Sequence, residues 1–187
     1  MTGIVLLAII AAVVFYAIVL YNQLVTKRQM ANEGWSGIDV QLKRRTDLIP
    51  NLLESVKGYM SHEKDTLREV TELRTKAQAI PDENVAERAK VEGMLSGALG
   101  RLLAIAENYP DLKASQNFID FQDALEDTEN KLEMARRYYN GTVRDLNVMV
   151  EQFPSNLIAG KFGFEKRDFF EIEEATDRAV PKVSFDS

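Results

Sequence analysis

An uncharged apolar run near the N-terminus constrains this chain more than any other feature. Residues 4–21 read IVLLAIIAAVVFYAIVLY, eighteen positions without a charged side chain. At about 1.5 Å per residue, a helix of this length spans about 27 Å, close to the roughly 30 Å hydrocarbon core of a bilayer. The run has no polar face, as a partly exposed core helix would have. It therefore predicts a helix that crosses a membrane.

A cleaved signal peptide is the main alternative, and three features oppose it. No Lys or Arg precedes the run, which is longer than the usual apolar core of about 7–15 residues. No small-x-small cleavage motif follows, because residues 22–25 read NQLV. We expect an uncleaved anchor over residues 1–21, which enters the membrane at Ile4. Tyr16 and Tyr21 near its inner end are typical of an interfacial aromatic belt.

The basic residues nearest the membrane predict the orientation of the chain. Lys27 and Arg28 follow the apolar run directly, and no basic residue precedes it. The positive-inside rule then places the C-terminal domain in the cytoplasm and the short N-terminal tail outside. We expect a single-pass protein in contact with the lipid bilayer.

Composition excludes several functional classes. The 187 residues include no cysteine and one histidine, which excludes disulfides, thiol catalysis, cysteine zinc sites and a multi-histidine metal centre within one chain. The formal net charge of −6 is opposite to the basic surplus of proteins that bind nucleic acid. We therefore expect no cofactor, no metal and no nucleic-acid partner.

The apolar period after the run is helical almost throughout. The first helix continues the membrane span through Trp35 and ends near Arg45. A second begins at Asp47, a good N-cap, with Pro50 in its first turn. A third covers 84–106. The fourth carries eleven seam positions spaced three and four apart: Phe118, Phe121, Leu125, Thr128, Leu132, Ala135, Tyr139, Thr142, Leu146, Met149 and Phe153. Such a seam must be buried against partner helices.

These patterns predict an all-α fold in which the transmembrane helix continues into an antiparallel four-helix bundle of long helices, residues 22–153. Residues 154–187 differ in character. Most of the chain's nine phenylalanines lie from Phe153 onward, and the stretch from Glu171 is acidic and expected to be mobile. Either the tail folds back over the bundle, or its aromatic side chains insert between neighbouring subunits. The side chains concerned are Phe153, Phe162, Phe164, Phe169 and Phe170.

Two groups of residues on the first helix are candidates for interaction. Lys43, Arg44 and Arg45 close the predicted helix, where cations complement the helix dipole or, as the weaker alternative, meet lipid headgroups. Trp35 is expected in the core. Asp39 lies one turn before Lys43 and can pair with it.

Two further groups lie on the later helices. Gly93, Gly97 and Gly100 share one helical face, which indicates either close approach of two helices or a groove for a helix of another protomer. Tyr138 and Asn140 lie off the seam and are candidates to face a partner. Asn140 also begins an Asn-Gly-Thr triplet, which we do not expect to be glycosylated on a cytoplasmic helix.

Catalytic motifs are missing from the sequence. His62-Glu63 resembles the start of a zinc-protease helix, but Thr66 stands where the second histidine belongs. The carboxylates of Glu173 and Glu174 lie in a segment expected to be too mobile for acid–base catalysis. We therefore do not expect an enzyme.

Three long segments resemble the LemA family. They are residues 21–59 (YNQLVTKRQMANEGWSGIDVQLKRRTDLIPNLLESVKGY), 106–115 (AENYPDLKAS), and 136–147 with 153–164 (RRYYNGTVRDLN and FPSNLIAGKFGF). The chain departs from the common pattern at Gln29, where the family often has Asn, and at Gly34, where it often has Ala. With the anchor, the resemblance covers essentially the whole chain.

The resemblance implies a bacterial inner-membrane protein with one N-terminal span, a cytoplasmic four-helix bundle and no known catalytic activity. It also implies associations with membrane shaping and with a membrane zinc protease. The first functional hypothesis is a self-assembling scaffold, a homo-oligomer that organises membrane or other membrane proteins. The alternative is an adaptor or signal-transmitting partner of a membrane protein such as a protease.

Overall fold

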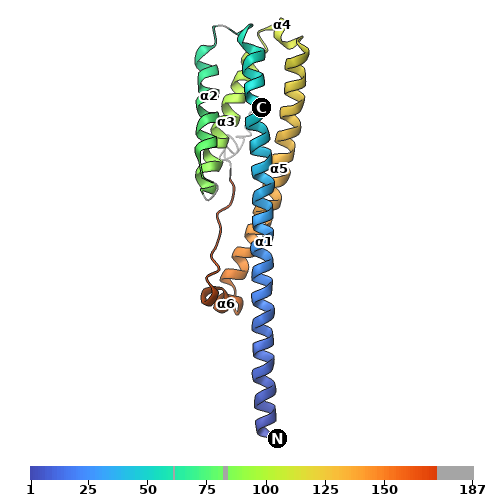
Figure 1. The fold of residues 1–187 in the computed structure, drawn as a ribbon, viewed down its shortest axis with the longest axis vertical. Helices are drawn as coiled ribbons and strands as arrows, with labels where there is room; N and C mark the ends of the chain where they lie inside the picture. The colour runs from blue at the N-terminus through green and yellow to red at the C-terminus, as the bar shows by residue number, and fades with distance from the viewer. Residues whose placement is uncertain (61, 82–83, 172–187) are drawn as a thin grey trace, which may run out of the picture. The chain divides into compact units, whose positions relative to one another are not determined.

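The computed structural model describes residues 1–60, 62–81 and 84–171, and within them every regular element is a helix. The acidic stretch after Glu171, with Glu173 and Glu174, lies outside the described residues. The helices are α1 (Thr2–Lys57), α2 (Lys64–Ala79), α3 (Val85–Ala106), α4 (Pro110–Lys113), α5 (Gln116–Glu151) and α6 (Ser155–Phe162) (Figure 1). The predicted all-α class is confirmed.

Contacts group the described chain into two units. Unit 1 comprises residues 1–41 and 130–169, and unit 2 comprises residues 42–129 with 170–171. The long helices α1 and α5 therefore contribute residues to both units. The division at residues 21 and 153 expected from the sequence stays a prediction.

Helix α1 is longer than the sequence predicted. The expected boundary at Asp47 is wrong, because α1 runs unbroken through Pro50 to Lys57 (Figure 1). Proline has no N–H, so the carbonyl of Thr46, four residues earlier, loses its helical donor. Arg74 of α2 supplies a replacement, since its Nε donates to that carbonyl at 3.0 Å. The carbonyl remains satisfied and the helix continues.

The first part of α1 is exposed and apolar. Almost every side chain from Ile4 to Ile18 is exposed, and the first buried one is Leu20. This segment is long and apolar enough for a helix to cross a membrane. Only 6% of the most apolar stretch of this segment is buried within the described chain, and the membrane anchor stays a prediction.

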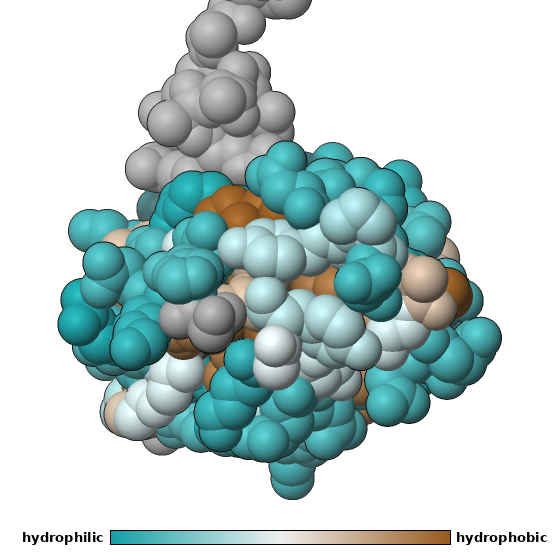
Figure 2. All heavy atoms as spheres, turned by 90° about the horizontal axis from the view of Figure 1, so that it is seen from above, coloured by the Kyte–Doolittle hydropathy of each residue, from teal (hydrophilic) through white to brown (hydrophobic). Residues whose placement is uncertain are grey.

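Unit 2 has one large apolar core, to which α1, α2, α3, α4 and α5 all contribute. Its buried side chains are Ile49, Leu52, Val56, Met60, Val70, Leu73, Ala77, Ile80, Val91, Leu95, Ala98, Leu99, Leu102, Ala106, Leu112, Phe118, Phe121 and Leu125. The seam predicted from the sequence on the fourth helix supplies Phe118, Phe121 and Leu125 of this core. Figure 2 looks onto the α4 end of this unit, where hydrophilic side chains cover most of the surface and apolar ones show only in small areas.

Unit 1 has a smaller core in which α6 packs against α1 and α5. Leu24, Met149, Ala159 and Phe164 are buried together there. Nine of the eleven predicted seam positions on α5 are buried, Ala135 is half-buried, and Phe153 is 79% exposed. The seam therefore ends at Met149. Phe153 lies beyond the last residue of α5, so it no longer follows the helical period.

Candidate functional site

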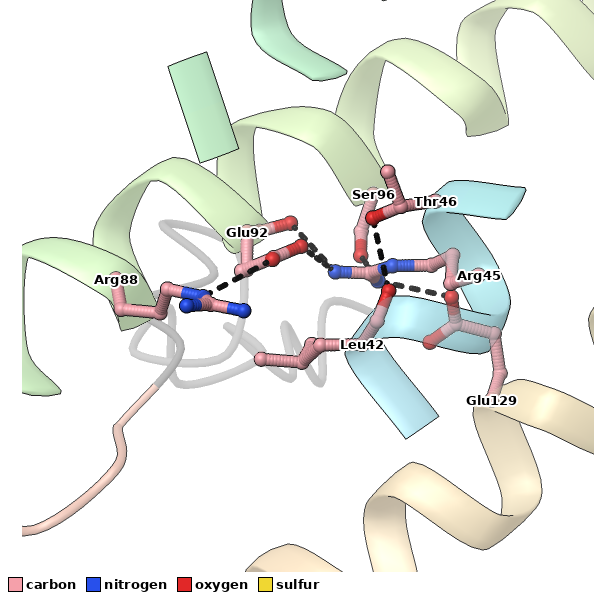
Figure 3. A network of polar contacts seen from close by, with 7 residues as sticks. All are labelled: Leu42, Arg45, Thr46, Arg88, Glu92, Ser96 and Glu129. Carbon is pink, nitrogen blue, oxygen red and sulfur yellow. Dashed lines mark hydrogen bonds and ion pairs between the residues drawn. The ribbon is translucent and has the colours of Figure 1, made fainter. Parts of the chain in front are cut away.

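A buried charge network crosses the core of unit 2 (Figure 3). The side chain of Arg45 has no exposed surface, and its Nη2 donates to the carboxylate of Glu92, itself 1% exposed. Its Nη1 donates to Ser96 Oγ at 2.6 Å and to Glu129 Oε1 at 2.9 Å. One guanidinium from α1 thus joins α3 to α5, using the planar fork of donors that suits carboxylates.

Arg45 is a fixed cation rather than a proton donor. Burial alone would lower the pKa of Arg45, but the carboxylates of Glu92 and Glu129 outweigh it and raise that pKa above its ordinary value. Arg88 Nε also lies 3.6 Å from Glu92 Oε1, so Glu92 meets two cations. A buried guanidinium held by carboxylates in this way suits structural specification.

The predicted basic cluster therefore divides. Arg45 does not close a helix, because α1 continues for another twelve residues, and the interpretation that it complements the dipole of a helix end is wrong. Lys43 is exposed, and Arg44 forms a partly exposed ion pair with Asp127 at 3.1 Å. Sequence reasoning missed Glu92 altogether. A lone buried arginine and glutamate, 47 residues apart, leave no local pattern to find.

Unit 1 contains a close helix contact at Gly34. A Cβ atom there would lie 3.0 Å from Tyr139 Cα and 3.3 Å from Tyr138 Cδ1, so the absent side chain lets α1 and α5 approach. Trp35 is half-buried beside it, with its ring centroid 5.5 Å from that of Tyr139. The core position expected for Trp35 is thus only partly met. Asp39 is half-buried on the same helix.

The predicted glycine face on α3 behaves differently. Close approach of two helices is wrong at Gly97 and Gly100, where a Cβ would meet nothing nearer than Arg101 Nη1 at 3.9 Å and nothing within 4 Å, respectively. Both are exposed, and Gly93 is half-buried. A groove for another protomer at this face stays a prediction.

Substitutions at Gly34 should separate helix propensity from crowding. Gly34→Ala is expected to change the unfolding free energy by less than about 1 kcal/mol, because better helix propensity offsets the tight contact. Gly34→Leu should destabilise by about 1–3 kcal/mol, since the backbone at Tyr139 cannot yield as a side chain can. Denaturant titration of the full chain in detergent measures both. Gly37, where a Cβ has open space, is the control, and an equal loss from Gly37→Leu would contradict the explanation.

A second set of contacts in unit 1 holds the chain after α6. Tyr139 donates its hydroxyl to the Asp168 carbonyl at 3.0 Å. Asn147 donates to the Arg167 carbonyl and accepts from the Arg167 N–H, both at 2.9 Å. Burial raises the pKa of Tyr139, an effect that Arg167 opposes and Asp168 reinforces, so the phenol stays a donor. Asn147 was missed by sequence reasoning, while Tyr138 is exposed and Asn140 is half-buried.

The aromatic segment turns back at Gly163. That residue has a φ of 68°, which favours glycine, and it ends α6 so that Phe164 points into the core of unit 1. Phe164 meets the edge of Tyr21 at a centroid distance of 5.7 Å and lies 4.9 Å from the guanidinium of Arg28. Phe162 contacts Tyr21 at 4.9 Å and remains 54% exposed.

Some phenylalanines of the C-terminal segment fit a tail that folds back, and others remain exposed and could contact a neighbouring subunit. Phe164 and Phe170 are buried within the described chain, as expected if the tail folds back. Phe153, Phe162 and Phe169 keep between 39% and 79% of their surface exposed. Among the phenylalanines of the described part of this segment, these three remain available to a partner.

Close to this segment, Lys27 pairs with Asp145 across 2.9 Å. The hydrogen bond from Lys27 lowers the pKa of Asp145, so the carboxylate remains charged at neutral pH. The pair is partly exposed, and such pairs contribute at most about 1 kcal/mol. In the described residues, no group of three or more acidic or histidine side chains could hold a metal ion, and His62 lies exposed in the loop before α2 rather than on a helix.

Comparisons with known proteins agree on one family. The family model described as "LemA family" matches residues 34–185. "Protein LemA" of Metamycoplasma hominis is 26% identical over 153 residues, which is 82% of this chain and 69% of the relative. "Magnetosome protein MamQ 2" of Paramagnetospirillum magneticum is 23% identical over 200 residues, 93% of this chain and 74% of the relative. "Magnetosome protein MamQ" of Magnetospirillum gryphiswaldense is 24% identical, over 86% of this chain and 68% of the relative. The chain belongs to the LemA family.

Proposed function

We propose that this protein is a non-catalytic interaction module that self-associates at the bacterial inner membrane. The observation that carries the proposal is α1, one unbroken helix from an exposed apolar segment to core residues of unit 2. Such a helix ties a folded domain to a membrane without a flexible linker. Tethering in two dimensions raises the effective concentration, so weak lateral contacts suffice for assembly.

The proposed topology has one span, a short outer N-terminus and the remaining helices in the cytoplasm. Lys27 and Arg28, just after the apolar run, support this orientation. We further propose that residues 22–153 form an antiparallel four-helix bundle. The shared core of unit 2 and the short connections between its helices favour that arrangement.

Likeness to relatives named magnetosome proteins supports a role in organising a membrane. The surfaces available for lateral contact are those that the fold leaves open. They include the small-residue face of α3 at Gly97 and Gly100, and Tyr138 on α5. Phe164 and Phe170 are excluded from this role because their own chain covers them.

The mass of the intact protein in detergent tests the proposal. Light scattering corrected for bound detergent is expected to give a discrete oligomer larger than the 21.2 kDa chain. Gly97→Leu with Gly100→Leu should reduce that mass while the fold survives, because both positions have space for a side chain. Gly37→Leu is the matched control at another open helical glycine.

A monomer at all concentrations would overturn self-association. Cross-linking in cells would then test the adaptor role, with a membrane protease as the first partner to look for. An oligomer whose mass does not change with the α3 substitutions would support self-association but would show that the face at Gly97 and Gly100 is not part of the contact.

A further inference from the structure

We propose that Phe153 and α6 form a second, peripheral contact with the lipid bilayer, beside the point where α1 leaves it. The proposal rests on the membrane anchor of the proposed function. It assigns α6 the role of an interfacial helix, whose apolar side chains enter the boundary between headgroups and acyl chains to a depth of about 5–10 Å.

The position of α6 within unit 1 is the first argument. Phe162, its last residue, lies 4.9 Å from Tyr21 between ring centroids, and Tyr21 is the last residue of the apolar run. Figure 1 draws α6 beside α1. If residues 4–21 fill the hydrocarbon core, Tyr21 lies at the membrane–water interface. Because the Phe162 ring contacts the Tyr21 ring, the end of α6 then lies at the same interface.

The pattern of burial on this segment is the second argument. The small residues Ser155 and Ala159 are buried within unit 1, and Ile158 packs partly buried against its core. The large apolar side chains of Phe153, Leu157 and Phe162 are instead 79%, 62% and 54% exposed. A helix on a water-exposed surface turns most of its large apolar residues inward, whereas α6 turns Ile158 partly inward and leaves Leu157 and Phe162 exposed. This arrangement is typical of a segment whose outer face meets another apolar phase.

The basic side chains near α6 favour a lipid surface as the apolar phase that its exposed face contacts. Lys161 is the only charged residue between Phe153 and Phe164, although the whole chain carries a net charge of −6. Its side chain is exposed, and Arg28 lies over the Phe164 ring on the adjacent part of α1. Long cationic side chains beside apolar surface reach anionic headgroups while their stems stay apolar.

Continuity with the membrane span selects the bilayer over a second protein chain. The apolar exposed surface of α1 up to Ile18 and the contact between Tyr21 and Phe162 bring α6 to the end of a segment that lipid already surrounds in the proposed anchor. Lipid is therefore present at this position without any further association step. A second copy of the chain would have to displace it.

Spin labels at single cysteines in the full-length protein, reconstituted in vesicles with anionic lipid, test this inference. The chain has no cysteine of its own. A label at Leu157→Cys is compared with one at Met134→Cys, since both side chains belong to unit 1 and are exposed and apolar. Val13→Cys reports on the anchor itself. Accessibility to oxygen, which enters lipid, and to a water-soluble nickel chelate is measured at each label.

The label at position 157 is expected to be several-fold less accessible to the nickel chelate than the one at position 134, and as accessible to oxygen as a label in lipid. Lys161→Glu should reverse part of that difference in anionic vesicles. Equal nickel accessibility at 157 and 134, with the label at 13 in lipid, would overturn the α6 contact while the anchor stands. A label at 13 in water would overturn the anchor itself. Shielding of 157 from both reagents would indicate a protein neighbour and overturn the lipid contact.

Discussion

Replacement of Arg45 by methionine is expected to lower the unfolding free energy by about 3–5 kcal/mol. The reason is the charge that stays behind. Glu92 is 1% exposed and would lose the cation that binds it most directly, while Arg88 Nε lies farther away, at 3.6 Å. Glu129, which is 40% exposed, can be rehydrated and contributes little to the loss. Denaturant titration of the full chain in detergent, followed by circular dichroism, measures the effect.

The double variant Arg45→Met, Glu92→Met separates an unpaired charge from lost packing. Removal of both charges is expected to recover most of the stability, because a buried ion pair replaced by apolar residues of similar volume is often neutral or stabilising. Arg44→Met is the control, since the Arg44–Asp127 pair is nearly half-exposed and should be worth less than about 1 kcal/mol. If the double variant is as unstable as Arg45→Met alone, the stability loss comes from lost packing and not from an unpaired carboxylate at Glu92.

The second large effect is expected at the proline inside α1. Pro50→Ala should raise the unfolding free energy by up to about 3 kcal/mol, because alanine restores a helical N–H and removes the clash of the ring with the preceding turn. Arg74→Met should lower it by about 1–3 kcal/mol, since the Thr46 carbonyl then has no donor from either source. The same titration measures both single variants.

The two substitutions should be strongly coupled. With alanine at position 50, its N–H donates to the Thr46 carbonyl, so the loss caused by Arg74→Met is expected to shrink to a small fraction of its value in the parent chain. Arg68→Met, on the solvent side of the same helix, is the control. An equal cost of Arg74→Met in both backgrounds would show that Arg74 acts through packing rather than through this hydrogen bond.

The sequence predicted the fold class and most of the core because those properties are periodic. The seam of α5 follows the helical repeat over many residues, and its predicted positions are buried or half-buried as far as Met149. The predicted range of the third helix, 84–106, agrees with α3 to within one residue. The apolar run could also be identified from the sequence, because its length and its lack of charge alone show that a helix there is long and apolar enough to cross a membrane. None of these predictions needed knowledge of which helices meet.

The predictions that failed depend on a single distant partner. Asp47 and Pro50 satisfy the local rules for a helix start, but Arg74, from another helix, supplies the donor that lets α1 continue. Because α1 continues, Arg45 lies inside the helix and is buried beside Glu92, whereas the sequence predicted it at a helix end. In the same way, Gly34 rather than Gly97 or Gly100 marks the close helix contact, because Tyr139 faces it.

By itself, then, the sequence determined that the chain is helical, that its first eighteen-residue apolar run suits a membrane, and that the seam of α5 is buried as far as Met149. Only the tertiary structure decided where α1 ends, which arginine is buried, and which phenylalanines of the C-terminal segment stay exposed. Burial along a helix can be predicted from the sequence because each turn places an apolar residue on the same buried face. A hydrogen bond, a charge pair or a close approach is a single contact between residues distant in sequence, and it exists only once the helices have packed.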